Sequence, residues 1–165
     1  MILTERSSHR LARCKRIVAM LAASCLPSVT YADWQYTQWG GSPTAVIEAS
    51  GGSAGPNDDR GKDPLPLVAT LTAPYTGLGF NFDAYFIFDP AEQLRYVDLA
   101  PLHPESCNEI RFALMNSYGQ PDKRGSFGLL KWWHRESGNV VIYSEIGACQ
   151  IRYMSLSEPG QAGGL

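Results

Sequence analysis

Few residues of this sequence have the type and spacing that acid–base catalysis needs. His134 and Glu136 form an H-x-E triplet, His103 lies beside prolines, and Glu105 and Glu109 are one helical turn apart. The sequence contains neither a G-x-S-x-G nor an H-E-x-x-H motif, and no second His-containing motif accompanies the triplet. Glutamates at this spacing are more often a solvated helix face than a general acid and base. A hydrolase that uses His134 and nearby carboxylates is therefore kept only as an alternative function for this chain.

A glycine-rich stretch, QWGGSPTAVIEASGG at residues 38–52, allows either a phosphate-binding loop or a capped helix. It lacks the G-x-x-x-x-G-K-[ST] and G-x-G-x-x-G patterns, and no apolar strand leads into its glycines. Ser42 followed by Pro43 is typical of a helix start, and Gly51 lies where a left-handed cap would end the helix. We therefore predict a short capped helix with Ala45, Val46 and Ala49 on its apolar face.

An acidic loop follows at residues 51–66, where Asp58, Asp59 and Asp63 raise the possibility of a calcium site. Their spacing departs from the D-x-[DN]-x-[DN]-G pattern of a calcium loop at the third ligand. The glycines and prolines around them instead favour a solvated loop. We predict no metal and no other cofactor for this chain.

Two of the four cysteines, Cys107 and Cys149, fall within the part of the chain that we expect to fold. Neither belongs to a C-x-x-C pair or has a nearby histidine, which argues against a metal ligand or a reactive thiol. Two cysteines in an oxidising compartment usually pair. The sequence therefore predicts a Cys107–Cys149 disulfide that closes a loop of about 43 residues.

The N-terminal segment, residues 1–32, has the layout of a secretory signal peptide. Four basic residues precede an apolar run of about ten residues, which is too short to span a membrane, and Ala32 is a suitable cleavage point. An alternative interpretation makes Cys25 the lipidated first residue of a lipoprotein, although the match to a lipoprotein box is imperfect. We predict a periplasmic or secreted protein without a transmembrane segment, with the lipid anchor at Cys25 as the minority possibility.

Removal of residues 1–32 takes away five basic residues and one acid, which changes the net charge from −2 to −6. Nucleic-acid binding depends on lysine and arginine that neutralise phosphates. An acidic chain is therefore not expected to bind nucleic acid, and the predicted partner is another protein of the cell envelope.

Hydrophobic periodicity predicts an α+β fold. Helices are expected at 42–51 and 104–121, and each is followed by three strands. The expected strands cover residues 67–72, 80–88, 94–99, 127–135, 140–146 and 149–156. The resulting plan is two degenerate helix–βββ repeats, at 42–100 and 104–156, in one domain over 33–156, with helices packed on an antiparallel sheet. Residues 157–165 are predicted to be a disordered tail.

The aromatic residues suggest a possible contact surface. Trp132 and Trp133 are adjacent in an expected strand, so they must point to opposite faces of the sheet. Trp34 and Trp39 could extend an exposed patch, and aromatic side chains are favoured as interface anchors. The alternative is that these tryptophans pack in the core or fix the N-terminal segment. The alternation in the last strand places Cys149 on the face that the second helix should cover.

Several motifs resemble those of a group of small exported bacterial proteins of uncharacterised function. The pattern begins with W-G-x-S-P-x-x-V-I-x-A-S-G-G and continues with F-x-F-D-x-x-x-x-L-x-x-V-x-L, C-x-x-x-x-x-x-L-x-x-x-Y-G-x-P and a closing C-x-I-x-Y, over most of residues 34–156. The repeated plan is also similar to the architecture of the beta-lactamase inhibitor protein and of the small lipoprotein of the outer-membrane barrel-assembly machine. This second likeness implies a protein-binding module without an active site. Together with the lack of a catalytic motif, it favours a non-enzymatic binding protein.

Overall fold

The computed structural model describes residues 33–58 and 67–157 of the 165-residue chain. The predicted signal peptide at 1–32, the possible lipid anchor at Cys25 and nearly all of the predicted tail at 157–165 lie outside the described residues. Within them the fold is α+β, as predicted: a large antiparallel sheet, a short two-stranded sheet and two α-helices.

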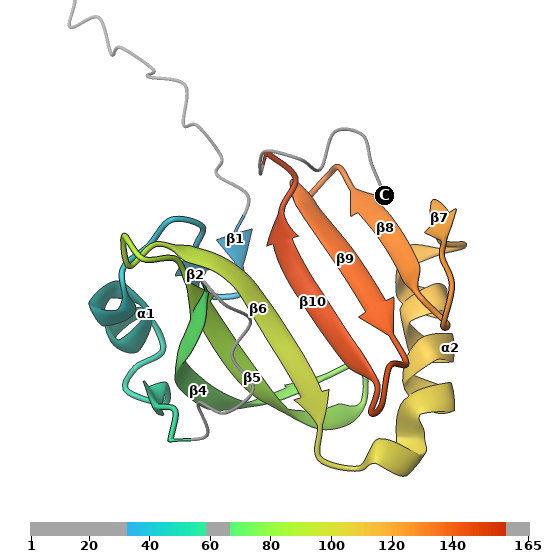
Figure 1. Cartoon of the computed structure of the whole chain (residues 1–165), viewed down its shortest axis with the longest axis horizontal. Helices are drawn as coiled ribbons and strands as arrows, with labels where there is room; N and C mark the ends of the chain where they lie inside the picture. The colour runs from blue at the N-terminus through green and yellow to red at the C-terminus, as the bar shows by residue number, and fades with distance from the viewer. Residues whose placement is uncertain (1–32, 59–66, 158–165) are drawn as a thin grey trace, which may run out of the picture.

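The large sheet has eight strands in the order β3–β4–β5–β6–β10–β9–β8–β7 (Figure 1). Two meanders, β4–β5–β6 and β8–β9–β10, meet where their third strands, β6 and β10, pair antiparallel. The bounds are β3 Gly55–Pro56, β4 Val68–Gly77, β5 Phe80–Phe88, β6 Leu94–Pro101, β7 Lys123–Arg124, β8 Leu130–His134, β9 Asn139–Ser144 and β10 Gln150–Ser155. The small sheet is the hairpin of β1, Asp33–Trp34, and β2, Thr37–Gln38.

The first meander follows the predicted alternation. Phe82, Ala84 and Phe86 of β5 are buried, as period-2 spacing requires of residues on one face. Phe88 continues the same face and is buried too, whereas Ile87 is buried on the opposite face of the sheet. The first strand of this meander, β4, is longer than the predicted 67–72, because it continues to Gly77 before the turn into β5.

The second meander corrects one predicted boundary. The expected strand at 127–135 starts only at Leu130. Phe127 has a positive φ of 55° and Gly128 a φ of 70°, a left-handed backbone that cannot continue a strand. These residues form the turn from β7 into β8, and the Phe127 side chain is 81% exposed.

Helix α1, Pro43–Ala49, begins and ends as predicted. The Ser42 side chain accepts a hydrogen bond from the Ala45 N–H at 3.3 Å, and Gly51 has a φ of 64°. Val46 is the buried residue of this helix, whereas both of its alanines are exposed. The sequence 38–52 is therefore a capped helix, as predicted.

Helix α2, Cys107–Tyr118, follows a short 3-10 turn at Pro104–Ser106. Its buried residues are Ile110 and Leu114, and Gly119 ends it with a φ of 77°. The two helices lie near opposite ends of the large sheet (Figure 1).

One hydrophobic cluster joins the helices to a single face of the sheet. It contains Val46 of α1, Ile110 and Leu114 of α2, and alternate residues of the six long strands. The strand residues on this face include Leu71, Phe86, Val97, Tyr153, Val141 and Trp132, which are paired strand by strand across the sheet. The helices therefore pack on one face, and the alternate side chains point to the other.

Candidate protein-binding surface

The four tryptophans predicted as possible partner-binding residues divide between the core and the surface. Trp34 and Trp132 are 3% and 2% exposed, so they belong to the core and not to an exposed patch. Trp34 of the β1–β2 hairpin packs on the sheet, with its ring centroid 5.8 Å from that of Phe86. Its burial results from contacts with distant strands.

Trp39 has the fixing role that was the alternative prediction. It is half-buried, and its Nε1–H donates to Asn139 Oδ1 at 2.8 Å. The Asn139 side chain in turn donates to the Asp33 carbonyl at 3.0 Å. These bonds fix the N-terminal hairpin to β9. Trp133 is half-buried on the opposite face of the sheet from Trp132, as the strand alternation predicted.

The face of the sheet opposite the helices is the candidate binding surface, and we call it the open face. Its members alternate with the core residues along β5, β6, β10, β9 and β8. They are Tyr85, Tyr96, Asp98, Arg152, Ile142, Lys131 and Trp133. All except Asp98 are partly exposed, and neither described helix packs on them. An apolar row of Ile87, Met154 and Val140, all at most 2% exposed, runs through its middle.

A charge pair is fixed at the centre of the open face. Arg152 Nε and Nη2 donate to the two carboxylate oxygens of Asp98 at 2.7 Å and 2.6 Å. The guanidinium also lies 4.8 Å from the centroid of the Tyr96 ring. The hydrogen bonds to Asp98 raise the pKa of Arg152. Because the bidentate geometry holds both charges together, this pair is a rigid, electrically balanced unit.

The β8 end of the open face is basic. Lys131 lies directly opposite Lys123 of β7, and its Nζ is 5.1 Å from the Trp133 ring centroid. Burial lowers the pKa of Lys131, and the charge of Lys123 lowers it further. Like charges on directly paired residues oppose strand pairing. Two lysines thus lie side by side next to Trp133 at this end of the open face.

His134, the residue of the alternative prediction, lies at the edge of the core face. It lines a cavity of about 270 Å³, together with Asp33 and Ser137. Its Nδ1 is 2.6 Å from Ser137 Oγ, within the turn between β8 and β9. Glu136, the other member of the H-x-E triplet, is exposed. Asp33 is thus the carboxylate residue that shares the cavity with His134.

The remaining candidate acid–base residues lie elsewhere. Glu105 and Glu109 are exposed at the start of α2, and His103 Nδ1 is 3.2 Å from Glu105 Oε1. Within residues 33–58 and 67–157, no group of three or more histidine, cysteine, aspartate or glutamate residues is placed to hold a metal ion. Of the predicted acidic loop, Asp59 and Asp63 lie outside the described residues.

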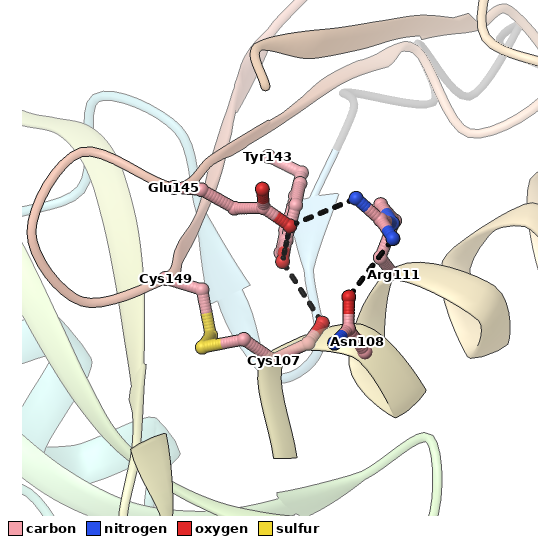
Figure 2. The surroundings of a disulfide bond; sticks show 6 residues. All are labelled: Cys107, Asn108, Arg111, Tyr143, Glu145 and Cys149. Atoms are coloured by element: carbon pink, nitrogen blue, oxygen red, sulfur yellow. Dashed lines mark hydrogen bonds and ion pairs between the residues drawn. A yellow bond between two sulfur atoms is a disulfide. The ribbon is translucent and has the colours of Figure 1, made fainter. Parts of the chain in front are cut away.

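The predicted disulfide is present between Cys107, the first residue of α2, and Cys149, just before β10 (Figure 2). The Tyr143 hydroxyl lies 2.9 Å from the Cys107 carbonyl and 2.8 Å from Glu145 Oε1, both acceptors for its proton. Glu145 also pairs with Arg111 at 3.2 Å. Burial raises the pKa of Tyr143 well above its ordinary value. The disulfide and this network attach the start of α2 to the second meander.

The end of α2 is attached to the same strands. Tyr118 Oη is 3.2 Å from Tyr153 Oη of β10, and Trp132 Nε1–H donates to the Gly119 carbonyl at 3.0 Å. The predicted contact between the second helix and the last strand is therefore present at both ends of the helix.

Comparison with protein families, curated proteins and solved structures found no match to this chain. Its function is consequently argued from its own residues. Sequence reasoning identified Trp133 but missed Tyr96, Asp98 and Arg152. The available signal was the alternation of these polar residues with Val97, Leu99 and the buried residues of the last strand.

Proposed function

We propose that this chain is a non-enzymatic module of the bacterial cell envelope that binds another protein through its open face. The observation that carries the proposal is the open face itself, a row of partly exposed aromatic and charged side chains on the side of the sheet that the described helices leave uncovered. Aromatic residues and arginine are the side chains most enriched at interface hot spots. The Asp98–Arg152 pair and the apolar residues beside it, Ile87, Met154 and Val140, provide a rigid centre.

The basic end of the open face defines the chemistry of the partner. Lys123 and Lys131 are cross-strand neighbours beside Trp133, whereas the whole chain has a net charge of −2. A partner surface with an apolar centre and a cluster of carboxylates at one end complements this arrangement, because opposite charges favour encounter and fix orientation.

An envelope location is part of the proposal. It is supported by the signal-like residues 1–32 and by the Cys107–Cys149 disulfide, since disulfides persist in oxidising compartments. No helix of the described residues is long and apolar enough to cross a membrane.

We also propose that the two meanders descend from one helix–βββ unit. The support is the strand order β4–β5–β6–β10–β9–β8, in which the second half reverses the first about the β6–β10 pair, and each meander follows a helix in the chain. Such an arrangement makes the open face continuous across both units.

The test is capture of partners from an envelope extract with the oxidised full-length chain. Three variants of the open face, Tyr96→Ala, Trp133→Ala and Lys131→Glu, are compared with Phe112→Ala, which removes an exposed aromatic of α2. Truncation of an interface hot spot weakens binding by at least about 2 kcal/mol, roughly 30-fold.

The proposal expects a protein that binds the parent and the Phe112→Ala variant but is lost from the open-face variants. The Lys131→Glu variant should show the greatest loss at low salt. If the same proteins are recovered with every variant, or if the Phe112 variant alone loses them, the open face is not the binding site.

The alternative function is an envelope hydrolase that uses His134. The observation in its favour is that His134 and Asp33 line the same cavity. Hydrolysis of a small ester such as 4-nitrophenyl acetate that is lost in His134→Asn but kept in His103→Asn would support it. Equal rates for the parent and both variants would remove it.

A further inference from the structure

Aromatic side chains from five different elements line the cavity beside His134, together with polar and aliphatic residues. Its volume is about 270 Å³, close to that of nine liquid water molecules at ~30 Å³ each. This is enough for one six-membered ring with a small substituent. The lining residues used below are Trp34, Tyr75, Tyr118, Tyr153 and His134, from β1, β4, α2, β10 and β8.

Three tyrosines, Tyr75, Tyr118 and Tyr153, line this cavity. Tyr118 Oη and Tyr153 Oη are 3.2 Å apart and share one hydrogen bond, so only one of their two hydroxyl hydrogens is used. Tyr75 Oη accepts a hydrogen bond from Gln35 Nε2 at 3.1 Å. Among the residues that the structure describes, no acceptor is bonded to the Tyr75 hydrogen or to the second hydrogen of the Tyr118–Tyr153 pair. Two donors are therefore available to an acceptor inside the cavity.

The phenols of Tyr75 and Tyr153 stay protonated over the neutral pH range. Burial raises the pKa of Tyr75 and of Tyr153, and the neighbouring phenol Tyr118 raises both further. Each hydroxyl thus remains a donor and carries no charge.

Aromatic rings form part of the cavity wall, beside polar side chains such as Gln35 and Asn139. The Trp34 ring centroid lies 5.1 Å from that of Tyr75 and 6.1 Å from that of Tyr153. On the other side, the rings of Tyr118 and His134 meet edge to face at 5.3 Å. Rings in these arrangements favour a planar guest that stacks or packs edge-on.

The charge of the lining disfavours an anion. The lining residues include Asp33 but no lysine or arginine. Burial raises the pKa of Asp33, so a second carboxylate in the cavity would be desolvated beside a group of the same charge.

We propose that this cavity binds a neutral single-ring molecule through a carbonyl or similar acceptor oxygen that faces Tyr75, Tyr118 and Tyr153. This site lies on the helix-covered face of the sheet and does not depend on the protein-binding function of the open face.

The test uses three probes that share one benzene ring. Benzamide is neutral and carries a carbonyl, benzoate is anionic, and toluene has no acceptor. Binding is measured by titration of the folded, oxidised chain, followed by tryptophan fluorescence and by amide NMR shifts of residues around Trp34. Benzamide should bind at least fivefold more tightly than either of the other two, because a hydrogen bond contributes about 1 kcal/mol and the carboxylate is opposed by the charge of Asp33.

Two variants remove hydroxyls and keep the rings: Tyr75→Phe, and the double variant Tyr118→Phe/Tyr153→Phe. Each should weaken benzamide binding about fivefold and leave toluene binding unchanged. The matched control is Tyr85→Phe, which removes a phenol from the open face. Tyr75 is only half-buried, so its variant remains folded even if the double variant does not.

The proposal is wrong if benzamide produces no shift around Trp34 at millimolar concentration, if toluene binds as tightly as benzamide, or if Tyr75→Phe binds benzamide like the parent. A cavity variant that loses benzamide binding but captures the same partners as the parent would show that this site and the open face act independently.

Discussion

Removal of the Cys107–Cys149 disulfide is the perturbation whose size follows most directly from the structure. The cysteines are 42 residues apart in sequence, and they join the start of α2 to the start of β10. In the chain-entropy model, a loop of about 43 residues that is no longer closed in the unfolded chain lowers stability by about 4 kcal/mol. A domain of this size has roughly 5–15 kcal/mol in total, so the expected loss is large.

The native contacts should survive this change. Tyr143 bonds to the backbone carbonyl of Cys107, which a Cys107→Ala substitution retains. The other end of α2 stays attached through Tyr118 and Trp132. The Cys107→Ala/Cys149→Ala variant should therefore keep the near-UV circular dichroism of the parent under native conditions and lose stability mainly through its unfolded state.

The assay is urea unfolding of three samples: the oxidised parent, the parent reduced with dithiothreitol, and the double alanine variant. The two samples without the disulfide should have similar urea midpoints, and in a parallel thermal melt both should unfold about 15 °C below the oxidised parent. A loss of less than about 1 kcal/mol in the variant would refute the loop-closure reasoning. A variant much less stable than the reduced parent would instead assign the effect to packing of the cysteine side chains.

Three further predictions concern pH, charge and helix capping. Burial raises the pKa of Tyr153 well above its ordinary value of about 10 in the folded chain, so the unfolded chain loses this proton first. The contribution of Tyr153 to the free energy of unfolding is therefore complete below about pH 10 and falls at higher pH. The Tyr153→Phe variant should accordingly lose less stability to urea between pH 9 and 12 than the parent does. Asp98→Asn should cost about 2 kcal/mol, since it replaces charge-assisted bonds to Arg152, and equal urea midpoints for variant and parent would contradict this. Ser42→Ala should cost about 1 kcal/mol by removing the cap of α1, and Ser42→Gly, measured in the same way, should cost less.

The strands and helices could be predicted because local patterns determine them. Alternation of apolar residues located β5 and β10. Ser42 marked the start of α1 through its capping side chain, and Gly51 and Gly119 marked helix ends because glycine readily adopts a positive φ. The disulfide could be predicted because only two cysteines fall in the folded part of a chain predicted to be exported, and alternation in the last strand then predicted its contact with the second helix. The position of each strand in the sheet, however, depends on pairing between strands that are distant in sequence, as between β6 and β10.

Other features depend on contacts that no local pattern encodes. Trp34 belongs to a two-residue strand, and its burial results from packing on Phe86 and Tyr153. Phe127 adopts a left-handed conformation that bulky residues rarely take, so the alternation in its neighbourhood predicted a strand that begins too early. Asp98 and Arg152 are 54 residues apart in sequence and lie on two different strands. Alternation could place both residues on one face of the sheet, but it could not show that their strands are neighbours.

The separation of the two faces makes the proposed function testable without loss of the fold. The main hydrophobic cluster lies on the face that carries both helices, whereas Tyr96, Lys131 and Trp133 project from the other. Their partly exposed side chains contribute less to stability than the buried Trp132, whose truncation to alanine would cost about 3–5 kcal/mol. Adjacent Trp132 and Trp133 thus form an internal comparison. Truncation of Trp132 should strongly destabilise the fold, whereas truncation of Trp133 should weaken partner binding by a chain that stays folded.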